Sequence, residues 1–171
     1  MDSALLYPLN GLLAAPGGAV WVWAGTHPAS LIFIAAAAIW VAAWPDLRTW
    51  ILPAALAAIV ANATVAHVWK PIFDRPRPCA EDPALLTDIP GAPPHCGQDN
   101  AFPSGHAATT AAIAIATMSQ PLMAVSVFIG VERVVVAAHH PSDVAVGWMY
   151  GGMIGWLARW AWSRRPKKRV G

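Results

Sequence analysis

The chain has 171 residues, 57% of them apolar and only 12% charged, with a net charge of +2 and a mean hydropathy of +0.48. A soluble domain usually carries about twice that share of charged residues, so the composition excludes an ordinary soluble domain and predicts one all-α membrane domain. Six of the eleven basic residues lie in residues 159–169. The first basic residue is Arg48, so the N-terminus lacks the charged region of a cleaved signal peptide.

The apolar segments predict a polytopic bundle of about five or six transmembrane helices. Residues 1–28 are apolar but interrupted by proline and glycine, and we expect them to lie in the membrane interface or to re-enter it, a kinked span being the alternative. Polar residues in the second span, Asn62, Thr64 and His67, are expected to join helices rather than to do chemistry. The predicted spans are residues 29–44, 50–69, 105–119, 122–138 and 143–162.

Residues 70–102 are polar and rich in Pro, Gly and Asp, which predicts a long outer loop, and loops of this length are often functional. Residues 163–171 form a basic tail, which the positive-inside bias places in the cytoplasm. Counting spans back from this tail leaves four basic residues outside, at the outer membrane–water interface. They are Lys70, Arg75, Arg77 and Arg133.

Cys79 and Cys96 are the only two cysteines, and both lie in this outer loop. An oxidising exterior favours a disulfide between them, which would hold Arg77 nearer to Ser104. Two free thiols are the alternative, and a zinc pair with His95 lacks further ligands at the usual spacing.

Three polar clusters lie at the outer ends of the spans. In the first, Lys70 and Arg77 together suit a phosphate, although both residues also suit a role as interfacial anchors. In the second, Ser104 is expected to cap a helix whose free N–H groups attract phosphate, and Gly105 to let the backbone approach the anion. His106 would transfer a proton there. An ordinary cap beside an interfacial histidine is the plainer alternative.

The third cluster contains Arg133, His139 and Asp143. An unpaired arginine near the end of an apolar span is costly, so Arg133 also indicates an anion. His139 is expected to be a nucleophile whose ring Asp143 orients, because Pro141 suits the start of a helix with Asp143 in its first turn. Spacing alone does not exclude His140 as a competitor. A loop histidine beside a capping aspartate is the plainer alternative.

A zinc site is the rival chemistry, with His106, His139, His140 and Asp143 as ligands. The nearby cations would repel a dication, and the chain has no His-x3-His or paired-cysteine spacing. We therefore expect a reaction that uses no metal and no other cofactor.

The chain contains three motifs in order: Lys70-x6-Arg77-Pro78, Pro103-Ser104-Gly105-His106 and Arg133-x5-His139-x3-Asp143. Together they resemble the three-part signature of the type 2 phosphatidic acid phosphatase superfamily. That superfamily also contains vanadium haloperoxidases and bacterial acid phosphatases, and the flanking helices resemble its membrane branch. One position departs from the pattern, because Glu132 stands where members often have Ser or Gly. A carboxylate there could compete for Arg133.

The resemblance implies metal-independent hydrolysis of a lipid phosphate or diphosphate through a phosphohistidine intermediate. It implies that His139 attacks phosphorus, that Asp143 orients His139 and that His106 protonates the leaving oxygen. The residues implied to bind phosphate are Lys70, Arg77, Ser104, Gly105 and Arg133.

In its small size and its predicted outward-facing site, the chain is similar to bacterial undecaprenyl-diphosphate phosphatases of the bacitracin-resistance type. This similarity implies a polyprenyl diphosphate substrate at the extracytoplasmic face of a bacterial inner membrane. Phosphatidylglycerophosphate, phosphatidate and decaprenylphosphoryl-phosphoribose phosphate are alternative substrates, and a non-catalytic lipid-phosphate binding or transport protein is an alternative of another class. The expected partners are the lipid substrate and the bilayer, without nucleic acid; the sequence does not indicate an oligomeric state.

Overall fold

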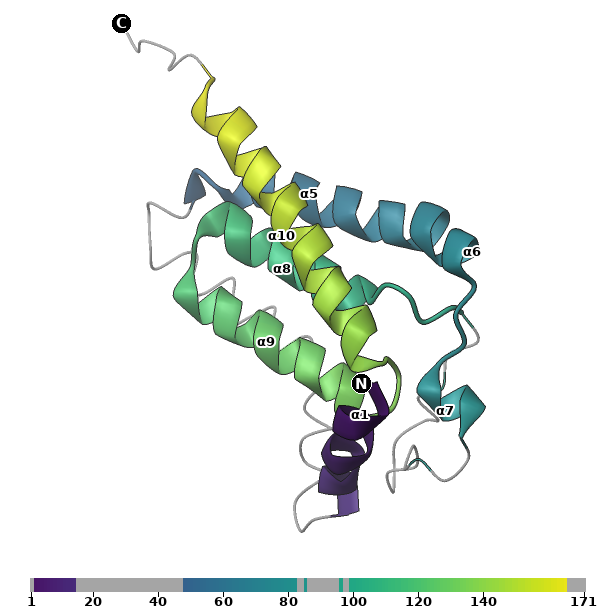
Figure 1. Ribbon diagram of the computed structural model, residues 1–171. Helices are drawn as coiled ribbons and strands as arrows, with labels where there is room; N and C mark the ends of the chain where they lie inside the picture. Colours follow the sequence, from purple (N-terminus) through teal and green to yellow (C-terminus); the bar gives the residue numbers. More distant parts are fainter. Residues whose placement is uncertain (1, 15–47, 83–84, 86–95, 97–98, 166–171) are drawn as a thin grey trace, which may run out of the picture.

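The computed structural model describes residues 2–14, 48–82, 85, 96 and 99–165, and these residues form helices and loops without any strand. The predicted span at 29–44, most of the 1–28 segment, much of the outer loop and the end of the basic tail lie outside the described residues. The helical elements are α1 (Asp2–Asn10), a 3-10 turn (Gly11–Ala14), α5 (Ile51–Thr64), a π-helical stretch (Val65–Trp69), α6 (Lys70–Phe73), α7 (Pro78–Glu81), α8 (Gly105–Thr117), α9 (Gln120–Val135) and α10 (Pro141–Ser163) (Figure 1).

The predicted spans at 105–119, 122–138 and 143–162 correspond to α8, α9 and α10. Helix α9 begins two residues earlier than predicted because Pro121 suits the first turn of a helix. The helical path of α5 also runs past the predicted loop boundary, through the π-helical stretch and α6, so Lys70 lies on a helix rather than in a loop. The π-helical stretch immediately precedes Pro71, whose ring would clash with a carbonyl in a regular α-helix.

Among the described residues, only the stretch Ile51–Glu81 is long and apolar enough to cross a membrane, with a mean hydropathy of 1.8. Helix α8 has 13 residues and α9 has 16, which is fewer than the roughly 20 that a straight span requires. The count of five or six transmembrane helices therefore remains a prediction.

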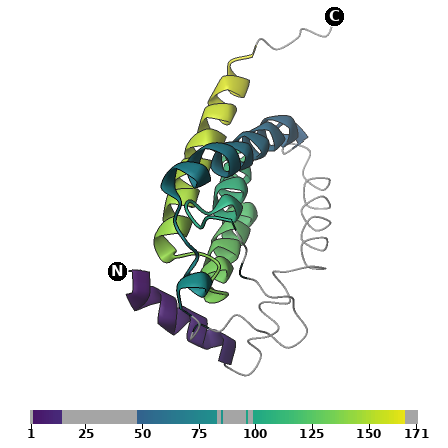
Figure 2. The same cartoon turned by 90° about the vertical axis from the view of Figure 1, so that its right-hand side faces the viewer.

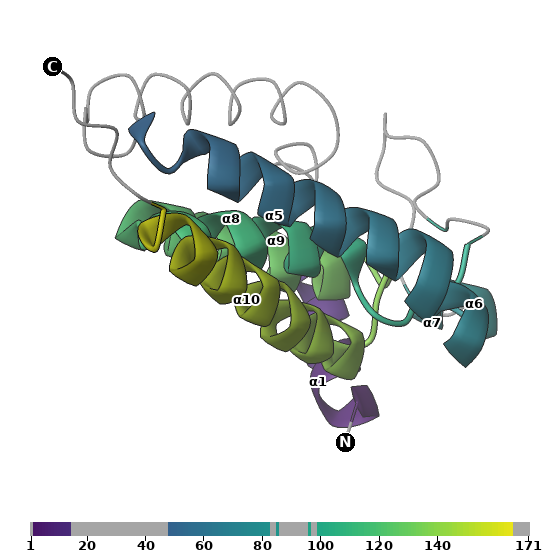
Figure 3. The ribbon, with the colours of Figure 1, turned by 90° about the horizontal axis from the view of Figure 1, so that it is seen from above.

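Helix α8 is central and packs against α5, α9 and α10 (Figures 1 and 3). Its buried face is made largely of alanine, and α10 presents glycines at intervals of four residues toward it. A Cβ atom added to Gly151 would lie 1.9 Å from the carbonyl oxygen of Ala108, and one added to Gly155 would lie 2.4 Å from that of Ala112. The two helix backbones therefore approach so closely that these positions require glycine.

Polar side chains also join the helices. The Thr64 hydroxyl lies 2.6 Å from the Tyr150 hydroxyl, which confirms the predicted linking role of Thr64. The Arg159 guanidinium donates to the Ala116 carbonyl at 3.0 Å and lies 3.9 Å from the centre of the Trp50 ring. The Thr64–Tyr150 contact joins α5 to α10, and the Arg159 contacts join the C-terminal part of α10 to α8 and to the start of α5.

Helix α1 lies across the opposite end of the bundle, beside the end of α9 and the start of α10 (Figures 1 and 2). The Asn10 amide donates to the Val135 carbonyl at 2.8 Å, and Leu6 is buried with Val134 and Val144. Nine helical residues extend only about 14 Å, roughly half the thickness of the hydrocarbon core. The interfacial or re-entrant character of the whole segment 1–28 stays a prediction.

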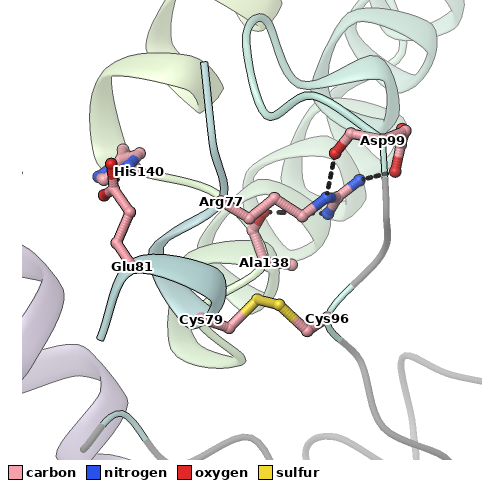
Figure 4. The surroundings of a disulfide bond; sticks show 7 residues. All are labelled: Arg77, Cys79, Glu81, Cys96, Asp99, Ala138 and His140. Atoms are coloured by element: carbon pink, nitrogen blue, oxygen red, sulfur yellow. Dashed lines mark hydrogen bonds and ion pairs between the residues drawn. A yellow bond between two sulfur atoms is a disulfide. The ribbon is translucent and has the colours of Figure 1, made fainter. Parts of the chain in front are cut away.

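Cys79 and Cys96 form a disulfide, as the sequence predicted (Figure 4). The Cys79 N–H also donates to the Ala137 carbonyl at 3.1 Å, so α7 is attached both to the outer loop and to the connection between α9 and α10.

Reduction of this disulfide is expected to lower the free energy of unfolding by about 3 kcal/mol, because the bond closes a loop of 17 residues in the unfolded chain. Thermal unfolding in detergent with and without reductant measures the change, and intact mass after alkylation reports the thiols. Two alkylated thiols in the unreduced protein would contradict the bond. An unchanged unfolding temperature after complete reduction would contradict its stabilising role.

Candidate active site

Backbone and side-chain hydrogen bonds bring the three polar clusters together at one end of the bundle. The Ser104 N–H donates to the Asp143 carbonyl at 3.0 Å, which connects the second cluster to the third. The Arg77 guanidinium donates to the Ala138 carbonyl at 3.0 Å, which connects the first to the third (Figure 4). Residues 61 positions apart in sequence are therefore in direct contact at one site.

His139 and Asp143 are buried side by side. Their exposed fractions are 2% and 0%, and His139 Nδ1 lies 3.7 Å from Asp143 Oδ2. Pro141 opens α10 as predicted, which places Asp143 in the first turn, where its carboxylate accepts the His140 N–H at 2.8 Å. The 3.7 Å separation is too long for a hydrogen bond, but catalytic hydrogen bonds of this kind often tighten when the substrate binds.

The surroundings of His139 favour its neutral form. Burial lowers the pKa of His139, and the charges of Arg77 and Lys70 lower it further, although Asp143 acts in the opposite direction. At neutral pH the imidazole therefore keeps a free lone pair, which a nucleophile requires.

Each cation predicted to bind phosphate contacts a carboxylate. The Asp99 carboxylate pairs with Lys70 and, at 2.6 Å, with Arg77. Burial alone would raise the pKa of Asp99, but these two cations hold it at about 2. Arg133 forms a two-point ion pair with Glu132, at 2.5 and 2.6 Å, so Glu132 does compete for this arginine. Two carboxylates, Asp99 and Glu132, thus pair with the cations that are expected to bind the phosphate oxygens.

Ser104 caps α8 as predicted, and its hydroxyl accepts the Ala107 N–H at 3.4 Å. A Cβ atom on Gly105 would make only ordinary contacts, at 3.6 Å, so protein packing does not require glycine there and close approach of an anion stays a prediction. His106 is exposed at the start of α8, where the charges of Arg133 and Arg77 act on its imidazole. The charges that act on His106 show that the start of α8 lies near the cations.

His140 belongs to a different environment from His139. Its Nε2 lies 3.4 Å from the Glu81 carboxylate, and in Figure 4 this pair lies on the opposite side of Arg77 from Asp99. This placement favours His139 as the nucleophile and gives His140 contacts with α7 instead.

Arg75 is one of the site residues whose role sequence reasoning missed. It was identified only as one of the outer cations, yet its guanidinium donates to the Asp143 carboxylate at 2.7 Å. A basic residue on the predicted outer side indicated that Arg75 has a partner or a role there, but no sequence spacing indicated that the partner is Asp143.

The sequence model described as the PAP2 superfamily matches residues 50–167 of the chain. The chain belongs to the PAP2 superfamily. The matched region includes all three motifs and every described helix of the bundle except α1. This member is also similar to the lipid A 1-phosphatase of Rhizobium etli, with 28% identity over 123 residues. The similarity covers 68% of this chain but only 52% of that protein, so the chain spans about half the length of this curated relative. No solved structure matches the chain.

Proposed function

We propose that this PAP2 protein hydrolyses a lipid phosphate or diphosphate through a phosphohistidine formed on His139. The observation that carries the proposal is the buried His139–Asp143 pair beside cations contributed by separate helices. Membership of the PAP2 superfamily and similarity to a lipid A 1-phosphatase support the same chemistry.

In the first step, Nε2 of His139 attacks the terminal phosphorus, and the bond breaks between this phosphorus and the oxygen that joins it to the rest of the lipid, which is the bridging oxygen in a diphosphate. His106 donates a proton to that oxygen, and Asp143 stabilises the positive imidazole ring. A water molecule, deprotonated by His106, then attacks the phosphohistidine and releases inorganic phosphate and neutral His139. Lys70, Arg77 and Arg133 stabilise the negative charge on the phosphoryl oxygens, with Ser104 and Gly105 at the helix start beside them.

Exposed apolar side chains support a lipid environment around the bundle. Ile59 on α5 is 64% exposed and Met149 on α10 is 75% exposed, and each belongs to a series of exposed apolar residues on its helix. We place the site on the extracytoplasmic face of an inner membrane and the basic tail in the cytoplasm, because the distribution of basic residues favours that orientation.

The substrate has two leading candidates. A polyprenyl diphosphate remains the first, on the basis of the small size and the outward-facing site. The lipid A 1-phosphatase relative adds a second, a phosphate carried on the saccharide head group of a lipid. Both present a terminal phosphate at a membrane surface, which is the group that the cations suit.

The decisive experiment measures phosphate release by purified protein in detergent from polyprenyl diphosphate, lipid A, phosphatidylglycerophosphate and phosphatidate, with and without EDTA. Turnover of at least one lipid that persists in EDTA and is inhibited competitively by vanadate is the expected result, because vanadate on His139 resembles the transition state. Binding of these lipids without phosphate release would instead indicate a transport or binding protein. Activity that only an added metal restores would contradict the metal-free mechanism.

Asp99→Asn is expected to lower the KM for the lipid phosphate by about two- to fivefold without changing kcat much. Phosphate must displace the Asp99 carboxylate from Lys70 and Arg77, and a partly exposed ion pair contributes at most about 1 kcal/mol. Steady-state kinetics and vanadate inhibition measure the change. Asp74→Asn is the matched control, because it removes the same charge at the end of α6, in a left-handed conformation that asparagine also adopts. A higher KM in Asp99→Asn would show that Asp99 instead prepares the cations for substrate.

A further inference from the structure

Arg75 lies beside Asp143, and its guanidinium donates hydrogen bonds to the side chains of Asp2, Ser142 and Asp143. Its Nη1 donates to Asp143 Oδ1 at 2.7 Å and to the Ser142 hydroxyl at 2.8 Å. Its Nη2 donates to Asp2 Oδ2 at 3.0 Å. One guanidinium therefore joins the first turn of α10 to α1.

The carboxylate of Asp143 depends on these donors. A fully buried carboxylate is costly unless charged or hydrogen-bonding partners surround it. Arg75 holds Oδ1, and the His140 N–H holds Oδ2, which is the oxygen that faces His139 Nδ1 at 3.7 Å. With Oδ1 held by Arg75, Oδ2 stays in place to accept a hydrogen bond from His139 Nδ1 when the imidazole ring becomes positive.

Asp2 in turn fixes Arg75. Its Oδ1 accepts the Ser142 N–H at 3.0 Å, and its Oδ2 accepts the Ser142 hydroxyl at 2.7 Å as well as Arg75 Nη2. The Ser142 N–H is one of the free donors at the start of α10, so a carboxylate is favoured there by both hydrogen bonding and the helix dipole. Arg75 is therefore held between two carboxylates, Asp2 and Asp143.

We propose that Arg75, held by Asp2 of α1, is a positioning residue that orients Asp143 for the reaction of His139. The proposal rests on the proposed function of His139. Arg75 touches neither the phosphate nor the leaving group. By holding Oδ1 it fixes the plane of the Asp143 carboxylate, whose other oxygen, Oδ2, faces Nδ1 and stabilises the imidazolium and the phosphohistidine. Loss of Arg75 lets the Asp143 carboxylate rotate away from Nδ1.

A cavity of about 410 Å³ beside Arg75 makes this role testable by chemical rescue. Its lining includes Asp2, Tyr7, Arg75, Glu81 and His140, and the Arg75 side chain is 30% exposed. Removing the arginine side chain would enlarge this opening. A small guanidinium ion could then reach Asp2 and Asp143 without passing through the phosphate site.

The experiment compares wild type, Arg75→Ala, Arg75→Lys and Asp2→Asn for kcat, KM and inhibition by inorganic phosphate, with thermal unfolding measured in parallel. We expect Arg75→Ala to lower kcat about 10- to 100-fold, as the loss of supporting partners does elsewhere, with KM and phosphate inhibition nearly unchanged. Non-denaturing methylguanidinium should restore part of kcat in Arg75→Ala. Arg75→Lys and Asp2→Asn should show smaller losses of kcat, and Tyr7→Phe, on the same helix as Asp2, should behave as wild type.

An unchanged kcat in folded Arg75→Ala would overturn the proposal. A rise in KM and weaker inhibition by phosphate, with kcat preserved, would also overturn it by showing a direct phosphate contact. Should Arg75→Ala fail to fold, the kcat of Arg75→Lys and Asp2→Asn decides the question in the same way. Failure of the proposed function is distinguishable, because wild type would then release no phosphate or His139→Ala would remain active.

Discussion

His139→Ala is expected to lower kcat by about 10⁴- to 10⁶-fold, the range found when a nucleophile is removed from a catalytic triad. The side chain is buried beside Asp143, and its surroundings keep it neutral. No other histidine in the described residues shares this environment. Phosphate release by the folded variant measures the effect, and rapid-quench trapping of phosphoenzyme tests the intermediate directly.

His140→Ala is the matched control, because the two histidines are adjacent but His140 lies beside Glu81. Its loss should reduce stability slightly and leave most of the activity. The assignment would be wrong if His140→Ala were inactive while His139→Ala retained turnover.

Gly151→Ala is expected to destabilise the bundle by about 3 kcal/mol or more, near the upper end of overpacking effects. The new Cβ would lie 1.9 Å from a backbone oxygen of Ala108, and the α8 backbone can move away only by disturbing its other packed faces. The site would be affected too, because α8 and α10 carry Ser104 and Asp143 at their first turns. Thermal unfolding and size-exclusion chromatography in detergent measure the loss.

Gly152→Ala provides the control one residue away on α10. A Cβ atom there would meet only Ile115, at 3.8 Å, which is an ordinary contact. Since alanine is favoured over glycine in a helix by about 1 kcal/mol, this variant is expected to be neutral or slightly more stable. Equal destabilisation by the two substitutions would contradict the close packing of α8 against α10.

The sequence predicted those features that depend on local pattern. Apolar length located α8, α9 and α10 within a few residues, Ser104 and Pro141 marked helix starts, and the location of both cysteines in one outer loop predicted their bond. Each of these follows from a residue's own chemistry and its near neighbours. The sequence places four glycines in α10, but only the structure separates Gly151 from Gly152.

The features that the sequence did not predict depend on contacts between distant segments. Arg75 and Asp2 each resembled a surface charge until α1 and α10 lay side by side. Asp99 lies in a loop without periodicity, so its pairing with Lys70 and Arg77 had no local signal. The continuation of helix to Phe73 was missed because the loop was predicted from the polar, Pro-, Gly- and Asp-rich composition of residues 70–102, whereas the helical path runs on through the π-helical stretch and α6.

The contact of Asp2 with Ser142 spans 140 positions of the chain and has a consequence for biosynthesis. A ribosome makes α1 before α10, so Asp2 has no partner on α10 until the intervening segments have emerged. Contacts between such distant residues form late, because closing the intervening chain must precede them. The Asp2–Ser142 contact therefore forms only after α10 has been made, so the hydrogen bonds that hold Arg75 beside Asp143 are completed late in folding.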